Sequence, residues 1–163
     1  MKIASISTGF ADIPGQISLN IFAQGCKLCC KGCQNPDLLD FNGGEEISVS
    51  NMEIILKSKP MTEWICWLGG DAVYQPEEFL AFNKLFKEKS LKIALYTGRY
   101  FEDIQDLIKD VDLIIDGPWD DSKGTVKDES TNQRTWHKEG MNWERVKFTE
   151  LEKILENMNN KGE

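Results

Sequence analysis

The chain has 163 residues, of which 40% are hydrophobic and 28% charged, and its formal net charge is −8. This composition is typical of a folded chain rather than a disordered one, so we expect a single domain over residues 1–163. The acidic balance and the lack of a basic tract argue against non-specific binding of nucleic acid. No apolar run approaches the roughly 20 residues that span a bilayer, and no signal peptide is apparent. We therefore expect a cytoplasmic protein whose partners include neither nucleic acid nor a membrane.

The predicted elements alternate between strands and helices along the chain. Alternating or continuous apolar runs predict strands at 17–23, 63–68, 91–96, 112–115 and 134–137. Helical spacing of apolar residues predicts helices at 51–58 and 76–89, an amphipathic segment at 101–109, and a last helix from 149 onward. Capping-box patterns pair Ser50 with Glu53 and Thr149 with Glu152. The polar stretch 120–132 predicts a surface loop.

This alternation predicts an α/β fold with a parallel sheet and right-handed crossovers. In such sheets, ligands bind at the carboxyl ends of the strands. Four segments follow predicted strands: the cysteine-rich stretch after residue 23, Gly69-Gly70-Asp71, Thr97-Gly98 and Asp116-Gly117. We therefore expect these segments to converge on one site.

Four of the five cysteines lie within residues 26–33. Clustered thiols in a chain without a secretion signal indicate metal binding or redox chemistry rather than structural disulfides. Cys26, Cys30 and Cys33 form a Cys-x3-Cys-x2-Cys set; alternatively, adding Cys29 gives two adjoining Cys-x2-Cys pairs that could bind zinc. Zinc knuckles usually lie about 15–20 residues apart, which favours the first grouping. A 4Fe–4S cluster normally takes four thiolates, so three would leave one iron open to a small molecule.

The Cys-x3-Cys-x2-Cys set after a strand resembles the radical S-adenosylmethionine enzymes. Its surroundings, Gly25-Cys26 and Cys30-Lys31-Gly32-Cys33-Gln34-Asn35, are most similar to the activating proteins of anaerobic (class III) ribonucleotide reductase. Further similar segments are Gly69-Gly70-Asp71 where the family has Gly-Gly-Glu, Tyr96-Thr97-Gly98, Asp116-Gly117-Pro118 and Asn132-Gln133-Arg134. The resemblance thus covers most of residues 15–137.

The resemblance implies a partial, open parallel β/α barrel that binds a 4Fe–4S cluster and S-adenosylmethionine. It implies that Cys26, Cys30 and Cys33 hold the cluster, and that the cofactor contacts include Asn35, Gly69, Gly70, Asp71, Thr97 and Asp116. One electron would cleave S-adenosylmethionine to methionine and a 5′-deoxyadenosyl radical. That radical would take a hydrogen atom from a glycine of the reductase large subunit. The family also implies a low-potential electron donor such as flavodoxin or ferredoxin.

Three residues depart from the family pattern. Gln34 stands where an aromatic residue is frequent, Asp71 is one methylene shorter than the usual Glu, and Cys29 is an additional thiol that we expect to be a bystander. Cys66, inside an apolar strand, is expected in the core. Two alternatives remain open from the sequence: a radical enzyme acting on a small molecule, such as one resembling 7-carboxy-7-deazaguanine synthase, and a non-catalytic zinc-binding module.

Overall fold

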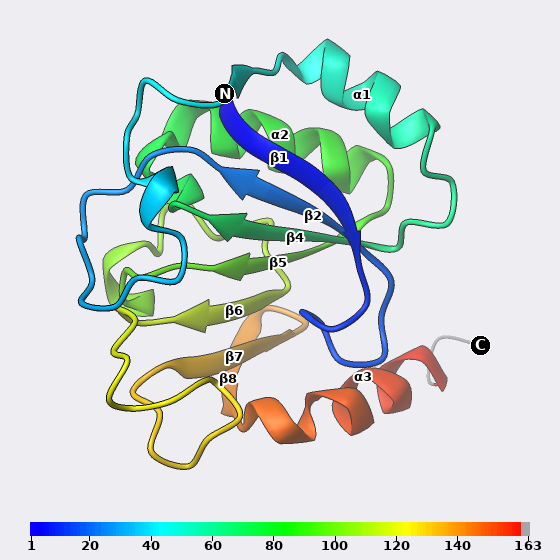
Figure 1. Ribbon diagram of the computed structural model, residues 1–163. Helices are drawn as coiled ribbons and strands as arrows, with labels where there is room; N and C mark the ends of the chain where they lie inside the picture. The colour runs from blue at the N-terminus through cyan, green and yellow to red at the C-terminus, as the bar shows by residue number, and fades with distance from the viewer. Residues whose placement is uncertain (161–163) are drawn as a thin grey trace.

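A computed structural model describes residues 1–160, so the last three residues of the predicted domain lie outside the described range. Within these residues, eight strands form one open sheet in the order β3-β1-β2-β4-β5-β6-β7-β8 (Figure 1). The strands are β1 (Lys2–Gly9), β2 (Ser18–Ala23), β3 (Glu45–Glu46), β4 (Trp64–Gly69), β5 (Lys92–Tyr96), β6 (Leu113–Asp116), β7 (Arg134–Glu139) and β8 (Asn142–Val146). The helices are α1 (Val49–Lys57), α2 (Pro76–Glu88) and α3 (Leu151–Asn160).

The four middle strands β2, β4, β5 and β6 pair in parallel, each with the next. The carboxyl ends of these four strands all lie at the same end of the sheet, on the left in Figure 1. Antiparallel strands flank them: β1 pairs with β2 on one side, and the β7–β8 hairpin pairs with β6 on the other. The predicted α/β fold with parallel strands in an open sheet is confirmed, with antiparallel strands added at both sides.

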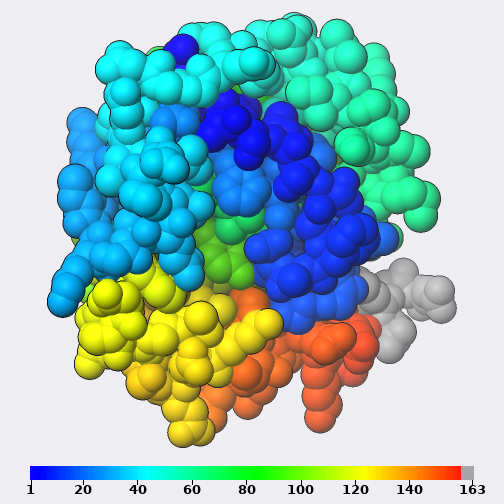
Figure 2. Space-filling view, viewed as in Figure 1, coloured from blue at the N-terminus to red at the C-terminus, as the bar shows by residue number. Residues whose placement is uncertain are grey.

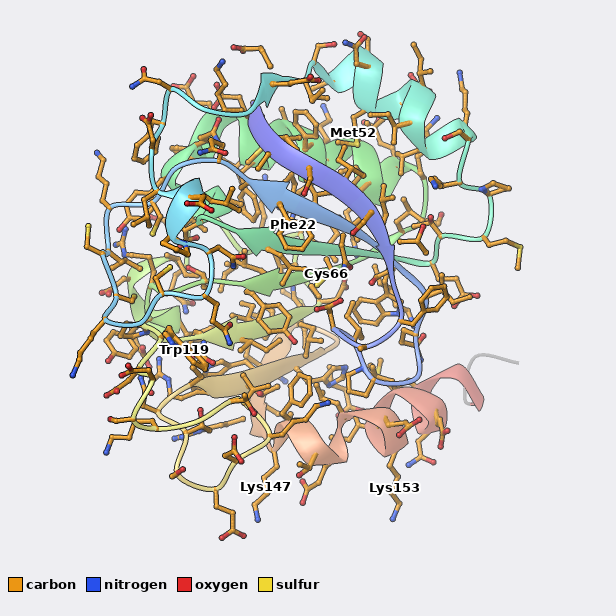
Figure 3. All side chains as sticks on the ribbon, viewed as in Figure 1. Phe22, Met52, Cys66, Trp119, Lys147 and Lys153 are labelled. Atoms are coloured by element: carbon orange, nitrogen blue, oxygen red, sulfur yellow. The ribbon has the colours of Figure 1, made fainter. Side chains whose placement is uncertain are left out.

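Helices cover both faces of the sheet because strand residues alternate between the faces. Trp67 points to the face covered by α1 and α2, where it contacts the rings of Phe79, Phe82 and Phe86. Its neighbour Cys66 points to the opposite face, which α3 covers. Cys66 is fully buried within the sheet (Figure 3), so the prediction of a core thiol is confirmed.

Helix α2 begins at Pro76, as predicted, whereas the starts of α1 and α3 differ from the predictions by one or two residues. Helix α1 is capped by Ser48, whose side chain accepts a hydrogen bond from the Asn51 amide at 3.1 Å. Ser50 lies inside the helix and Glu53 pairs with Lys89 at 2.7 Å instead, so the predicted capping box is wrong. At the other end of the chain, a 3-10 turn over Phe148–Glu150 precedes α3, which places the start of that helix after the predicted cap.

The amphipathic segment 101–109 is a 3-10 turn over Phe101–Asp103 followed by further turns, and not an α-helix. Ile104 and Ile108 are nevertheless buried in the core, so helical spacing here reflects which side chains are buried rather than a regular helix. Strands β1, β3 and β8 were not predicted. None of the helices within residues 1–160 is long and apolar enough to cross a membrane.

Candidate functional site

The cysteine loop (residues 24–39) leaves the carboxyl end of β2, and main-chain hydrogen bonds close its base. The amide of Gly25 donates to the carbonyl of Leu38 at 2.7 Å, and the amide of Cys26 donates to that of Leu39 at 3.2 Å. The carbonyl of Gly25 accepts from the amide of Asp71 at 2.9 Å, which ties the loop to the end of β4. The base of the loop is therefore closed without using any of its thiols.

Gly70 lies where the end of β4 approaches the cysteine loop. A Cβ atom on Gly70 would lie 2.5 Å from the carbonyl oxygen of Gly25 and 2.9 Å from that of Leu38. Both obstacles are main-chain atoms, which cannot rotate away as the tip of a side chain can. The absence of a side chain at this position is thus a condition for the contact between loop and strand.

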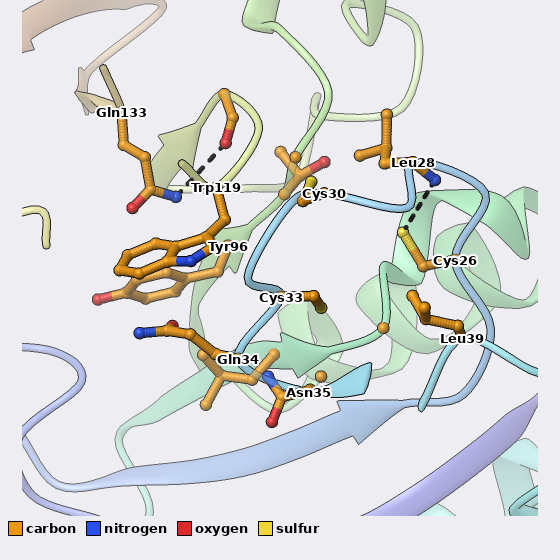
Figure 4. Close-up of a pocket in the computed structure, with 16 residues that line it drawn as sticks. Cys26, Leu28, Cys30, Cys33, Gln34, Asn35, Leu39, Tyr96, Trp119 and Gln133 are labelled. Atoms are coloured by element: carbon orange, nitrogen blue, oxygen red, sulfur yellow. Dashed lines mark hydrogen bonds between the residues drawn. The ribbon is translucent and has the colours of Figure 1, made fainter. Parts of the chain in front are cut away.

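Three cysteines of the loop, Cys26, Cys30 and Cys33, line one open-mouthed cavity of about 130 Å³ (Figure 4). The predicted contacts that line the same cavity are Asn35, Gly69, Gly70 and Thr97. Among its described lining residues there is no Asp, Glu, Lys, Arg or His. The sequence prediction that the strand ends converge on the cysteine loop agrees with this arrangement.

Cys29 is separated from the other thiols of the loop. Its backbone has a φ of 49°, in the left-handed region, and its side chain is exposed. It does not line the cavity that Cys26, Cys30 and Cys33 share. This placement is compatible with the predicted role of a bystander, which stays a prediction.

The donor set fits an iron–sulfur cluster better than a single metal ion. Within residues 1–160, no three His, Cys, Asp or Glu side chains converge as ligands of one ion would, although three thiols share the cavity. A cluster with four irons takes one thiolate per iron, so its ligands are spread out. Burial raises the pKa of the Cys26 thiol to about 11, so its thiolate is expected to form together with the cation that it binds.

Asp71 is 1% exposed and its carboxylate faces the wall rather than the cavity. One carboxylate oxygen accepts from the Thr97 hydroxyl at 2.8 Å and from the Gly98 amide at 3.1 Å, and the other accepts from the Val73 amide at 3.4 Å. Burial raises the pKa of Asp71 to about 6, because these neutral donors only partly replace water. Asp71 thus joins the end of β4 to the end of β5 beneath the cavity.

Asp116 is also fully buried and does not line the cavity. Its carboxylate accepts from the Phe101 amide at 2.6 Å and from the Trp136 indole at 3.1 Å. It also pairs with two nitrogens of Arg134, with Nε at 3.0 Å. Asp116 therefore anchors the start of the post-β6 loop (residues 117–133) to β7, whereas its neighbour Gly117 lines the cavity.

Several lining residues were missed as site residues. Trp119 and Tyr96 contribute aromatic rings, and Leu28 contributes an apolar side chain. Tyr96 is the last residue of a predicted strand, and Trp119 comes four residues after another. The direction in which their rings point cannot be predicted from a single sequence. Gln133 also lines the cavity; the sequence offered only its place in a polar segment that resembles the family.

Residues 14–136 match the family model described as a 4Fe-4S single cluster domain. Among curated relatives, the pyruvate formate-lyase-activating enzyme of Clostridium pasteurianum is 33% identical over 121 residues, which cover 70% of this chain and 50% of the relative. The pyruvate formate-lyase 1-activating enzyme of Escherichia coli K12 is 30% identical over 118 residues, covering 67% and 48%. The chain thus spans about half the length of these relatives.

Among solved structures, the crystal structure of QueE from Escherichia coli is similar, with a TM-score of 0.51 and 13% identity. The match covers 60% of this chain and 52% of QueE. At this level of identity the likeness concerns the fold alone, and it agrees with the open sheet of parallel middle strands.

Proposed function

Because this chain belongs to the family of 4Fe-4S single cluster domains, within the radical S-adenosylmethionine superfamily, we propose that it activates a glycyl radical enzyme. The relatives named as activating enzymes of pyruvate formate-lyase support this reaction class. We further propose that the target is the large subunit of anaerobic ribonucleotide reductase, which rests on the sequence segments around Cys33, Gly117 and Gln133. The observation that carries the proposal is the cavity shared by three loop cysteines and the Gly-Gly strand end.

The cofactors of this superfamily are a 4Fe–4S cluster and S-adenosylmethionine, and the cavity offers groups for both. Cys26, Cys30 and Cys33 would hold the cluster. When bound and reduced, the cluster supplies the electron that cleaves the sulfonium of S-adenosylmethionine. An electron carrier of low potential, such as flavodoxin or ferredoxin, would be the donor.

The residues of the chain would bind and orient S-adenosylmethionine and limit the access of water. Gly69 and Gly70 present main-chain groups to the cavity without a side chain in between. Asn35 and Thr97 add polar side chains on the same lining. Leu28 supplies an apolar side chain, and burial of such groups keeps reactive species away from solvent.

In this proposal, Asp71 and Asp116 fix the position of residues that surround the cavity. Asp71 fixes the hydroxyl of Thr97 and the amide of Gly98 through hydrogen bonds. Asp116 fixes the first residues of the post-β6 loop through its pairing with Arg134. The sequence-based assignment of both as cofactor contacts stays a prediction, and a position in the wall gives each an indirect route to the same site.

The proposal is tested with anaerobically purified protein reconstituted with iron and sulfide. We expect about four irons per chain and formation of 5′-deoxyadenosine from S-adenosylmethionine under a strong reductant. Adding the reductase large subunit should then give a glycyl radical signal in electron paramagnetic resonance. A signal with pyruvate formate-lyase alone would change the target, and 5′-deoxyadenosine without either signal would favour a small-molecule substrate. Zinc in place of iron, with no cleavage, would overturn the proposal.

A further inference from the structure

The indole N–H of Trp119 is buried and has no hydrogen-bond partner within the described part of the chain. The same residue lines the cavity that holds the three cysteines. Buried donors without a partner are uncommon, because the hydrogen bond to water that is lost on folding goes unreplaced. The nitrogen itself is closed off from the empty cavity, so a small turn of the ring would bring this unpaired donor to an acceptor on a bound ligand.

Trp119 lies with Tyr96 and Gln133 at one side of the cavity, whereas Cys26 and Leu39 lie at the other (Figure 4). The side-chain nitrogen of Gln133 donates to the carbonyl of Gly117 at 3.4 Å. Its side-chain oxygen has no hydrogen-bond partner in residues 1–160, so it can accept. This side of the cavity thus offers one neutral donor and one neutral acceptor, and its lining contains no charged residue.

This pair of groups matches the main chain of a peptide, which presents a carbonyl acceptor and an N–H donor at each residue. We propose that Trp119 and Gln133 form a subsite for the main chain of the glycine-containing segment of the partner enzyme. The Trp119 indole donates to a peptide carbonyl and the Gln133 oxygen accepts from a peptide N–H. The inference rests on the proposed function, since it names how the substrate of that reaction is held.

The location of the subsite suits a macromolecular substrate. The post-β6 loop is at the surface, and its yellow residues border the hollow that Figure 2 shows beside the blue and cyan residues of the cysteine loop. Middle-strand residues are visible at the floor of this hollow. Glycine has no side chain, so hydrogen bonds to its main chain are the contacts through which such a wall can hold it.

The test compares Trp119→Phe, which deletes the donor and keeps an aromatic ring, with the holoenzyme. The matched control is Trp143→Phe, since Trp143 lies on β8 and packs against Phe101 away from the cavity lining. Three properties are measured. The first two are dissociation constants, determined by calorimetry on the unreduced enzyme: one for S-adenosylmethionine and one for the purified reductase large subunit. The third is the yield of 5′-deoxyadenosine in the absence of the partner.

We expect Trp119→Phe to weaken binding of the large subunit about three- to tenfold, the effect of one lost hydrogen bond. Binding of S-adenosylmethionine should weaken less than binding of the large subunit, and Trp143→Phe should change none of the three properties. Equal losses in both binding constants would assign the indole to the nucleoside and overturn the subsite. Unchanged binding of the large subunit would overturn it as well, while leaving the proposed function intact. If the parent binds neither the reductase nor pyruvate formate-lyase, the proposed function fails and the subsite fails with it.

Discussion

The cysteine loop and the post-β6 loop both follow parallel strands and border the same cavity, yet they are held in different ways. The base of the cysteine loop is closed mainly by main-chain bonds, such as the 2.7 Å bond from Gly25 to Leu38. The Gln24 side chain adds a bond to the carbonyl of Asp40 at 2.7 Å, and no thiol takes part in closing the base. The base of the post-β6 loop is held by side chains: Asn132 donates to the carbonyl of Pro118 at 2.7 Å, and Asp116 pairs with Arg134.

This difference shows how a fold keeps ligand-binding groups free. A loop whose side chains must bind a cluster is best shaped by its main chain, because each thiol used for internal contacts would be lost as a ligand. A loop that contributes only one or two contacts can use most of its side chains for its own structure. In the post-β6 loop, Asp120 and Asp128 accept hydrogen bonds from neighbouring amides, while the Trp119 indole has no partner among residues 1–160.

The largest expected effect comes from removing a thiol that the cysteine loop keeps free. Cys30→Ser should lose most of the bound iron and lower the yield of 5′-deoxyadenosine at least a hundredfold, because a hydroxyl is a poor substitute for a thiolate ligand. Cys29→Ser is the matched control, and it should retain the cluster because Cys29 is exposed and outside the cavity. Iron analysis and product quantification check both. Loss of iron in Cys29→Ser would show that the fourth thiol is a ligand.

Removing the charged anchor of the post-β6 loop should destabilise the protein strongly. Arg134→Ala leaves the fully buried Asp116 carboxylate without its cation, and breaking a buried pair in this way costs about 3–5 kcal/mol. Urea unfolding of the two proteins at equal iron content measures the loss. The double variant Asp116→Asn with Arg134→Gln leaves no unpaired charge, so it should lose less stability than Arg134→Ala. An equal loss in both variants would mean that packing, and not charge, holds this loop.

The ionisation of Asp71 should make the stability of the folded protein depend on pH, because this carboxyl group links β4 to β5. Its pKa is raised from 3.8 to about 6 by burial, so the folded state holds the proton more tightly than the unfolded chain. The stabilising contribution is therefore complete below pH 4 and is lost as the pH rises through 6, by about 2–3 kcal/mol in all. Asp71→Asn cannot ionise and can still accept from Thr97 and Gly98. Urea midpoints between pH 4 and 7 should slope less in this variant, and equal slopes would contradict the prediction.

The smallest effect concerns the close approach at the base of the cysteine loop. Gly70→Ala places a methyl group 2.5 Å from a main-chain oxygen, and overpacking of this kind costs about 1–3 kcal/mol. Gly98→Ala is the matched control: its methyl group would meet the tip of the Leu28 side chain at 2.3 Å, which can rotate away. Thermal unfolding should rank Gly70→Ala below Gly98→Ala, and the reverse order would show that the loop yields more easily than Leu28.

The middle of the sheet could be predicted because its strands are apolar runs that end in glycine, as at Gly69 and Gly98. Strand β1 was missed because its side chains are mostly exposed or half-buried, so it lacks a clear apolar pattern. Its amino end is fixed by the Gln75 side chain, which bonds both the amide of Lys2 at 2.7 Å and its carbonyl at 2.9 Å. Such a contact across 73 residues has no local signal in the sequence.

At the site, the spacing of Cys26, Cys30 and Cys33 favoured grouping them, and these three thiols line one cavity; that they bind a cluster stays a prediction. The direction of the Asp71 carboxylate was not predictable, since it depends on a hydroxyl and an amide of the neighbouring strand. The position of Trp119 depends on how the post-β6 loop folds back, which local pattern does not encode.

The uncharged lining of the cavity has an electrical consequence. The lining has no cation to stabilise an electron added inside the cavity. Within residues 1–160, the loop sulfurs accept one hydrogen bond, from the Leu28 amide to Cys26 at 3.5 Å. Hydrogen bonds to sulfur, net charge and solvent exposure set the potential of iron–sulfur centres. We therefore expect a cluster bound in this cavity to hold an extra electron weakly and to pass it on readily to an acceptor.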